Sequence, residues 1–367
     1  LFANAKALVI AGCFFSGREA DRWRDVGLKL LEAELDEQIL ADGGHFELSP
    51  MYHATILEDV LDLIQTARLF PGQLDGHVRR WQEIAFRMLD WLAAMTHPDG
   101  EIAFFNDAAT GIARRLADLR RYAALLDVPA PADRAGMRHL AASGYVRLES
   151  GPWCAIFDVA EIGPSYIPGH GHADVLSFEL SLGAERLVTN SGTSSYAVGP
   201  VRRAERATAA HATVEIDGQN SSEVWESFRV GRRAHPFDVV VEEGAAVAAA
   251  SHDGYRWLPG RPVHRREIAM SAAQVRVRDC VTGGGRHHVV GRLPLHPSVR
   301  VAGVEPDGWR LEAPSGRVIR VRVKGPVERF TEQGHYAPAF GARVSRPVLA
   351  WRHDGPLSLS VETLFEL

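Results

Sequence analysis

A short segment with two closely spaced histidines carries the side chains best suited to acid–base or metal chemistry. His170 and His172 stand two positions apart in PGHGHAD, residues 168–174, just before an alternating apolar run. If the backbone there is extended, both side chains point the same way, and the glycines let the backbone bend or approach a bound group. Imidazole is both a common metal ligand and a common proton shuttle. The pair predicts a metal-supported active site, although a bare HxH pattern also occurs in ordinary loops.

A second segment, FELSPMYH at residues 46–53, predicts a tyrosine at the beginning of a helix. Ser49 is a plausible helix cap and Pro50 a plausible first helical residue. Tyr52 then lies in the first turn, where the positive end of the helix dipole favours a phenolate. A tyrosine so placed can take and return a proton. The alternative is that Tyr52 and His53 only pack against the helix or cap it.

Two polar residues that follow the histidine pair, Asn190 and His211, are candidates to complete a metal site with His172. Zinc prefers four ligands drawn from imidazole nitrogen, thiolate sulfur and carboxylate oxygen. Asparagine is a poor substitute for a carboxylate, so Asn190 counts against zinc.

An arginine-rich segment, residues 196–208, begins with Tyr196 and contains Arg202, Arg203 and Arg206. Guanidinium groups recognise carboxylate and sulfate through forked hydrogen bonds, and a solvated charged loop is the ordinary alternative. The formal net charge of −5 gives no general attraction to nucleic acid or anionic membranes. Attraction to a polyanion would therefore have to come from such a local cluster.

The overall composition predicts a two-domain globular protein. The chain has 367 residues, of which 46% are hydrophobic and 24% charged. No apolar run reaches the length of a transmembrane span. Its three cysteines are far apart and form no CxxC motif, which argues against a thiolate metal site or a disulfide framework. Oligomeric state stays open.

Apolar periodicity divides the chain into a helical part, residues 1–135, and a strand-rich part, residues 136–367, with a proline-rich linker at 128–133. Short loops between helices of similar length favour antiparallel hairpins, as in a bundle or toroid. Many short strands broken by glycine and proline favour an antiparallel sandwich. The expected helices are Ala3–Phe15, Arg18–Leu40, Met51–Phe70, Gly76–Met95 and Thr110–Leu126. The expected strands are Tyr145–Leu148, Cys154–Val159, Leu176–Leu182, Thr213–Ile216, Asp238–Glu242, Val275–Asp279, Arg317–Val323 and Leu357–Val361.

Taken together, these segments resemble the heparinase II/III family of polysaccharide lyases. The resemblance lies in FELSPMYH at 46–53 and in PGHGHADVLSFEL, NSGTSSY and AHATVEIDG between residues 168 and 218. It spans most of the chain, and the combination is specific although each piece alone is not. It implies an (α/α) toroid, here incomplete, followed by an antiparallel β-sandwich.

The resemblance implies β-elimination at a uronic acid of an acidic polysaccharide, in which a base removes the proton at C5 and the 4-O-linked sugar leaves. The carboxylate charge must be neutralised and the enolate-like intermediate stabilised. Tyr52 matches the family's catalytic tyrosine, acting as acid and, for one substrate stereochemistry, also as base. His170 matches the catalytic histidine. Tyr196, Arg206 and His53 would bind substrate, and a periplasmic or extracellular location is expected.

The resemblance also assigns a structural metal, zinc in some members, to His172, Asn190 and His211. The sequence departs from the family pattern here, because Asn190 replaces the usual aspartate and His211-Ala212-Thr213 replaces His-Asn-Thr. Relatives also carry an Asn-His pair that neutralises the substrate carboxylate. We expect that pair just before Leu1, and so expect this chain to be the downstream part of a longer protein.

The sequence leaves two main functions open. The first is a lyase acting on an acidic polysaccharide, favoured by the joint presence of Tyr52 and His170. The second is a non-catalytic glycan-binding or cell-envelope assembly protein on the same scaffold, favoured by Asn190. A hydrolase with paired carboxylates is weaker, because no acidic pair lies in a segment that indicates it.

Overall fold

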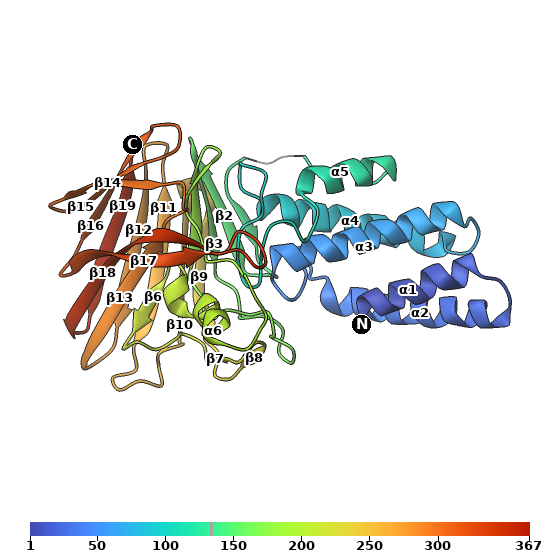
Figure 1. The fold of residues 1–367 in the computed structure, drawn as a ribbon, viewed down its shortest axis with the longest axis horizontal. Helices are drawn as coiled ribbons and strands as arrows, with labels where there is room; N and C mark the ends of the chain where they lie inside the picture. Colours follow the sequence, from blue (N-terminus) through green and yellow to red (C-terminus); the bar gives the residue numbers. More distant parts are fainter. Residues whose placement is uncertain (133–134) are drawn as a thin grey trace.

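Five helices make up the first third of the chain and lie to one side of the strands (Figure 1). The computed structural model describes residues 1–132 and 135–367. Helix α1 packs on α2, and α3 packs on α4 and α5. The helices are α1 (Phe2–Phe14), α2 (Arg18–Gln38), α3 (Pro50–Leu69), α4 (Asp75–Ala94) and α5 (Leu116–Leu125). All five expected helices are present, but α5 begins later than Thr110, because residues 110–115 form turns tied to the β domain by the hydrogen bond from Thr110 N to Pro338 O.

The N-terminus of α3 has the cap that the sequence predicts. Ser49 Oγ accepts a hydrogen bond from Tyr52 N at 3.2 Å, and Pro50 occupies the first turn. Leu57, Leu61 and Ile64 recur at helical spacing and are fully buried. The cap therefore fixes where the helix begins, and the apolar stripe fixes which face packs inward.

The second part of the chain is a layered antiparallel β domain, which confirms the expected fold class of helices followed by a sandwich. Every expected strand overlaps an observed one. The bounds are β1 (Arg138–Leu140), β2 (Tyr145–Ser150), β3 (Trp153–Asp158), β4 (Phe178–Leu182), β5 (Glu185–Val188), β6 (Val214–Ile216), β7 (Val224–Trp225), β8 (Arg229–Val230), β9 (Pro236–Glu242), β10 (Val247–His252), β11 (Val263–Met270), β12 (Gln274–Thr282), β13 (Arg286–Pro294), β14 (Arg300–Glu305), β15 (Gly308–Glu312), β16 (Val318–Lys324), β17 (Glu328–Tyr336), β18 (Val344–Pro356) and β19 (Leu359–Glu366). Between β5 and β6 lies the short helix α6 (Pro200–Arg206), followed by one 3₁₀ turn, η1 (Thr208–Ala210); a second 3₁₀ turn, η2 (Glu243–Ala245), precedes β10.

The strands form three larger sheets and one small hairpin. The strand orders are β1-β2-β3-β4-β5, β14-β15-β16-β19-β12-β11-β10-β9, β17-β18-β13-β6 and the pair β7-β8. One apolar core joins the three larger sheets; for example, it contains Val146 from β2, Val277 from β12 and Val289 from β13. Strands such as β11 alternate buried and half-buried residues, as expected when one sheet face covers this core.

A smaller apolar cluster fills the junction between the two parts of the chain. It contains Leu48 before α3, Trp91 from α4, Phe105 from the loop after α4 and Tyr145 from β2. This cluster holds the beginning of α3 against the β domain. Among the described residues, no helix combines the length and the apolar character needed to cross a bilayer.

The segment with the two histidines is an irregular loop just before a strand, so the condition that its backbone is extended is not met. Residues 168–177 form turns and irregular backbone, and β4 begins only at Phe178. Gly171 allows a close approach to the protein's own backbone, because a Cβ there would lie 2.3 Å from Ile162 O. The histidines are thus aligned by this tight loop and by a shared hydrogen-bond partner, and not by strand periodicity.

Candidate active site

A buried carboxylate, Asp107, joins the two histidines. Its Oδ2 accepts a hydrogen bond from His170 Nδ1 at 2.8 Å, and its Oδ1 accepts one from His172 Nε2 at 2.9 Å. Arg202 donates to both oxygens, at 2.7 Å to Oδ2. Burial would raise the pKa of Asp107, but the hydrogen bonds from His170, His172 and Arg202 outweigh it and hold the pKa well below its usual range. Asp107 is therefore a fixed negative charge that orients both imidazoles.

The structure brings Tyr52 and His170 together from the two halves of the chain. Their ring centroids are 4.2 Å apart, and Tyr52 Oη lies 2.7 Å from Tyr196 Oη. Because His170 Nδ1 donates to Asp107, the neutral imidazole carries its free lone pair on Nε2. A phenol and an imidazole with a defined basic nitrogen thus lie side by side, which is the geometry that acid–base chemistry needs.

Burial raises the pKa of Tyr52, contrary to the expectation that the helix dipole would favour its phenolate. The hydrogen bond with Tyr196 acts in the opposite direction, while the negative charges of Asp107 and Glu47 raise the pKa further. The pKa of Tyr196 is raised as well, first by burial and then by Asp107. Both phenols therefore stay protonated at neutral pH, so Tyr52 is poised to donate a proton in the resting site.

His172 and His211 face each other with one nitrogen apiece. His172 Nδ1 lies 3.1 Å from His211 Nε2, while His211 Nδ1 is bonded to Ala207 O at 2.8 Å. Since the outer nitrogen of each ring donates to an oxygen, both facing nitrogens carry lone pairs when the rings are neutral. Burial lowers the pKa of each ring to about 4. Two neutral imidazoles held in this way, with oriented outer nitrogens, are typical of metal ligands.

Two further side chains that could complete a cation site have unsatisfied polar atoms. His172, Asp174 and His211 each offer a ligand atom within 4.8 Å of the others. Asp174 Oδ2 is buried without a hydrogen-bond partner among the described residues, and so are both polar side-chain atoms of Asn190. The residues present therefore fit a cation, and Asp174 supplies a carboxylate that Asn190 cannot.

His53 lies in the protein interior, so the prediction that it contacts substrate is wrong. The residue is fully buried, its Nε2 is bonded to Met88 O at 2.9 Å, and its Nδ1 accepts from His45 N at 3.2 Å. Its ring packs on Trp91 with centroids 4.3 Å apart. Both ring nitrogens are used inside the protein, and His53 stabilises the packing of α3 on α4.

Arg206 is also buried, which corrects its assignment as a substrate ligand. Its guanidinium donates twice to Gly171 O, at 3.0 and 2.9 Å, and once to Trp225 O at 3.4 Å. Arg202 similarly donates to Ser227 O at 3.0 Å. The two arginines, four positions apart on α6, therefore hold the β7–β8 hairpin against the histidine loop.

Two site residues that the sequence did not single out, Asn106 and Asp107, lie in the loop between α4 and α5. Asn106 Nδ2 donates to Leu48 O at 3.0 Å, and its Oδ1 accepts from His172 N at 3.0 Å. Two adjacent polar residues between Phe104-Phe105 and Ala108-Ala109 are a usable signal, because a polar pair inside an apolar run must find partners when it is buried. The spacing of Arg202 and Arg206 after Pro200 was a second usable signal, because residues at i and i+4 lie on the same face of a helix.

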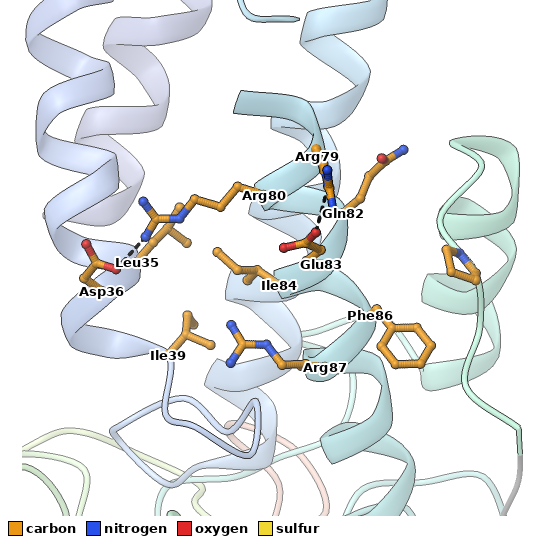
Figure 2. Close-up of a pocket in the computed structure, with 11 residues that line it drawn as sticks. Leu35, Asp36, Ile39, Arg79, Arg80, Gln82, Glu83, Ile84, Phe86 and Arg87 are labelled. Carbon is orange, nitrogen blue, oxygen red and sulfur yellow. Dashed lines mark hydrogen bonds and ion pairs between the residues drawn. The ribbon is translucent and has the colours of Figure 1, made fainter. Parts of the chain in front are cut away.

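A separate cavity of about 820 Å³ lies between α2 and α4 and is lined by none of the predicted site residues. Its charged side chains pair with their own neighbours (Figure 2): Arg80 with Asp36 at 2.6 Å and Arg79 with Glu83 at 3.1 Å. The described residues that line it include neither a histidine nor a tyrosine that could serve as acid or base.

Family models match nearly the whole chain. Residues 1–128 match the model described as Heparinase II/III N-terminus, and residues 132–354 match the model described as Heparinase II/III-like, C-terminal.

Two curated relatives have different names. The chain is 31% identical over 267 residues to FtsZ-localized protein C of Caulobacter vibrioides, covering 70% of this chain and 42% of that protein. It is 24% identical over 276 residues to a heparin-sulfate lyase of Bacteroides stercoris, covering 69% of this chain and 40% of that protein. The chain thus spans about two fifths of the length of these relatives.

Solved structures share the fold over the whole chain. A heparinase III matches with a TM-score of 0.81 at 21% identity, covering 100% of this chain and 59% of that one. A mutant of the heparan sulfate lyase HepC from Pedobacter heparinus matches with a TM-score of 0.79 at 18% identity, with coverage of 100% and 59%.

Proposed function

Because this chain belongs to the heparinase II/III family, we propose that the protein containing it is a polysaccharide lyase that cleaves a uronic-acid polymer by β-elimination. The observation that carries this proposal is the pair Tyr52 and His170, with ring centroids 4.2 Å apart and the imidazole fixed by Asp107. Relatives that are named heparin-sulfate lyases support the same reaction class.

In the proposed reaction, His170 Nε2 takes the proton from C5 of the uronate. The electron pair of that C–H bond forms the C4–C5 double bond as the C4–O4 bond breaks. Tyr52 gives its hydroxyl proton to the leaving oxygen, and for the other substrate stereochemistry Tyr52 would also act as the base. Each positioned proton transfer contributes roughly 10²- to 10⁴-fold.

Tyr196 has a supporting role in this proposal. Its raised pKa keeps its hydroxyl protonated, so it donates a hydrogen bond to Tyr52 Oη once Tyr52 has lost its proton. That bond lowers the pKa of Tyr52 and stabilises the phenolate formed during the reaction. Its contact with Tyr52 and its protonation state both support a role for Tyr196 in the proposed site.

We propose a structural cation, with zinc as the first candidate, at His172 and His211, completed by Asp174 and by Asn190. A cation bound there would accept the two facing lone pairs and fix the orientation of the His172 ring. Because His172 and His170 share Asp107, this would hold the catalytic imidazole in place without direct contact with substrate.

An acidic polysaccharide or oligosaccharide is the proposed partner, and the periplasm or cell exterior is the proposed location, because such polymers occur there. The test uses full-length protein and a panel of uronic polysaccharides. Elimination creates a double bond conjugated with the carboxylate, so ultraviolet absorbance rises as chains are cut. Products that lack this absorbance and contain an added water would instead show hydrolysis.

A second function, a non-catalytic glycan-binding or cell-envelope assembly role, is favoured by two observations. One relative is named FtsZ-localized protein C, and Asn190 occupies the position of a family aspartate. This alternative predicts binding of acidic glycans with no rise in absorbance for any polymer. The same panel, assayed for both binding and absorbance, separates the two functions.

A further inference from the structure

A cavity of about 690 Å³ opens beside His170 on the side of the β7–β8 hairpin. Pro168 and Gly169, directly before His170, form one wall, and Phe228 and Arg229 of the hairpin form another. Tyr196, whose hydroxyl is bonded to Tyr52, also lines it. The cavity therefore lies next to the proposed acid and base, sharing Tyr196 and the residues before His170 with their surroundings.

The hairpin wall is held in place by buried groups. Ser227 O accepts from Arg202, and Trp225 O accepts from Arg206, both from α6. The Phe228 ring lies 5.9 Å from the His170 ring and 5.2 Å from the Tyr196 ring, measured between centroids. Phe228 is nevertheless 45% exposed, so its apolar ring is accessible from the cavity while the hairpin that carries it is held by α6.

Two guanidinium groups, from Arg229 and Arg233, line the cavity. Arg229 is exposed and makes no side-chain hydrogen bond or ion pair with residues 1–132 or 135–367. Arg233 donates to the carbonyls of Pro164 and Ser165, at 3.2 and 2.9 Å, so its charge meets no described carboxylate. Glu226 is the acidic residue in the lining. A local excess of arginine on a chain with a net charge of −5 points to an anionic ligand.

We propose that this cavity is a subsite for an acidic sugar unit next to the uronate that is cleaved. The apolar face of the sugar packs on Phe228, and its carboxylate or sulfate accepts a forked hydrogen bond from Arg229. The position of the subsite relative to the broken bond rests on the lyase function proposed above, whereas its anion recognition does not.

The test measures binding separately from cleavage, in full-length Tyr52→Phe protein, whose chemistry is expected to be blocked. Arg229→Gln in this background is compared with Arg278→Gln, the same change at an exposed arginine of β12 outside the cavity. The probes are polygalacturonate, which carries carboxylates only, dextran sulfate, which carries sulfates only, and heparan sulfate, which carries both. Because Arg229 is exposed and unpaired, its replacement should leave folding unchanged.

Arg229→Gln is expected to weaken binding about fivefold to tenfold and to reduce its dependence on salt, while Arg278→Gln changes neither. Loss on polygalacturonate alone identifies a carboxylate ligand, and loss on dextran sulfate alone identifies a sulfate ligand. Unchanged affinity for all three probes would overturn the subsite even if the parent protein is an active lyase. Conversely, weakened binding without any cleavage by the parent would remove the lyase function and leave the subsite.

Discussion

Asp107 receives more hydrogen bonds than any group the sequence pointed to, and each has a separate consequence. Its bond to His170 Nδ1 sets the tautomer that leaves Nε2 free, and its bond to His172 Nε2 leaves Nδ1 of that ring free to face His211. Arg202 balances the buried negative charge. One loop carboxylate thus links the proposed base to the proposed cation site.

Asp107→Asn is expected to lower turnover about 10³-fold in the folded protein. An amide that donates to His170 Nδ1 would favour the opposite tautomer and place the ring proton on Nε2, where the base needs a lone pair. Stability should also fall, by about 3–5 kcal/mol, because Arg202 loses its buried partner. Kinetics are therefore measured at low temperature on protein shown to be folded by circular dichroism.

The matched control is Asp99→Asn, because Asp99 also pairs with a buried arginine, Arg186, but lies outside the site. It should lower stability and leave the turnover of the folded protein unchanged. If Asp107→Asn retained turnover within a fewfold of the parent, Asp107 would have no role in orienting His170.

Removal of the proposed cation should lower stability more than it alters the chemistry of protein that stays folded. We expect about one metal ion per chain by elemental analysis, and a chelator should lower the unfolding temperature by roughly 5–10 °C. His172→Ala should abolish the metal content. His252→Ala, at another fully buried histidine, should lower stability but keep the metal. Freshly purified protein without metal would refute the cation site.

At the scale of elements, the beginning of α3 positions Tyr52. Ser49 Oγ accepts from Tyr52 N and donates to Asp107 O at 2.6 Å, so one hydroxyl ties the helix cap to the loop that carries Asp107. Asp107 N in turn donates to His170 O at 3.1 Å. The helical and the sheet contributions to the site are therefore joined through backbone groups as well as side chains.

Ser49→Ala is expected to lower the free energy of unfolding by about 1–2 kcal/mol, since a helix cap and a buried hydrogen bond are both lost. Thr55→Ala serves as the control on the same helix, because Thr55 Oγ1 only bonds back to Met51 O. Its cost should stay within about 0.5 kcal/mol. Equal urea midpoints for the two variants would show that the two hydrogen bonds of Ser49 Oγ stabilise the fold no more than the single bond of Thr55 Oγ1 does.

The sequence predicts elements well where a local signal exists and poorly where tertiary packing decides. Ser49 and Pro50 marked α3 because capping is local. Strand β10, with Ala248, Ala249 and Ala250, was missed because alanine has little preference for strands and the segment shows no polar alternation. Its conformation comes from pairing with β9 and β11 on either side.

For the candidate site too, the sequence identified residues that lie in recognisable segments and missed those that only tertiary packing brings in. Tyr52 and His170 were found through their segments, but Asp107 lies on a loop far from both in sequence, and no spacing rule connects the three. His53 and Arg206 were misassigned because the sequence does not show which polar side chains are buried. Both use their donors inside the protein.

At the scale of the whole molecule, buried neutral histidines at the junction make stability depend on pH. Burial lowers the pKa of His53 to about 4 and that of His45 to about 3. Protonation of His53 would break the bond that its Nδ1 accepts from His45 N. The unfolded chain takes up these protons near pH 6.5, whereas the folded protein resists them, so the unfolded state binds more protons between pH 6.5 and 4.

Stability should therefore be constant above about pH 7 and fall as the pH drops toward 4, with each such histidine adding up to about 1.4 kcal/mol per pH unit. His53→Gln, which keeps a donor and an acceptor but does not titrate, should give a shallower dependence than the parent. Urea unfolding between pH 4 and 7 measures both slopes. Identical slopes would show that His53 is not held neutral by the fold.

Ultraviolet absorbance produced from uronic polysaccharides by the full-length protein and by its Tyr52→Phe variant is the decisive test of the proposed lyase function. Phenylalanine keeps the ring that packs on His170 and removes only the hydroxyl bonded to Tyr196. We expect a steady rise in absorbance for the parent and a rate at least about 10³-fold lower for the variant, with its unfolding temperature nearly unchanged. Equal rates for the two proteins, or no rise from the parent with any polymer, would contradict the proposed function.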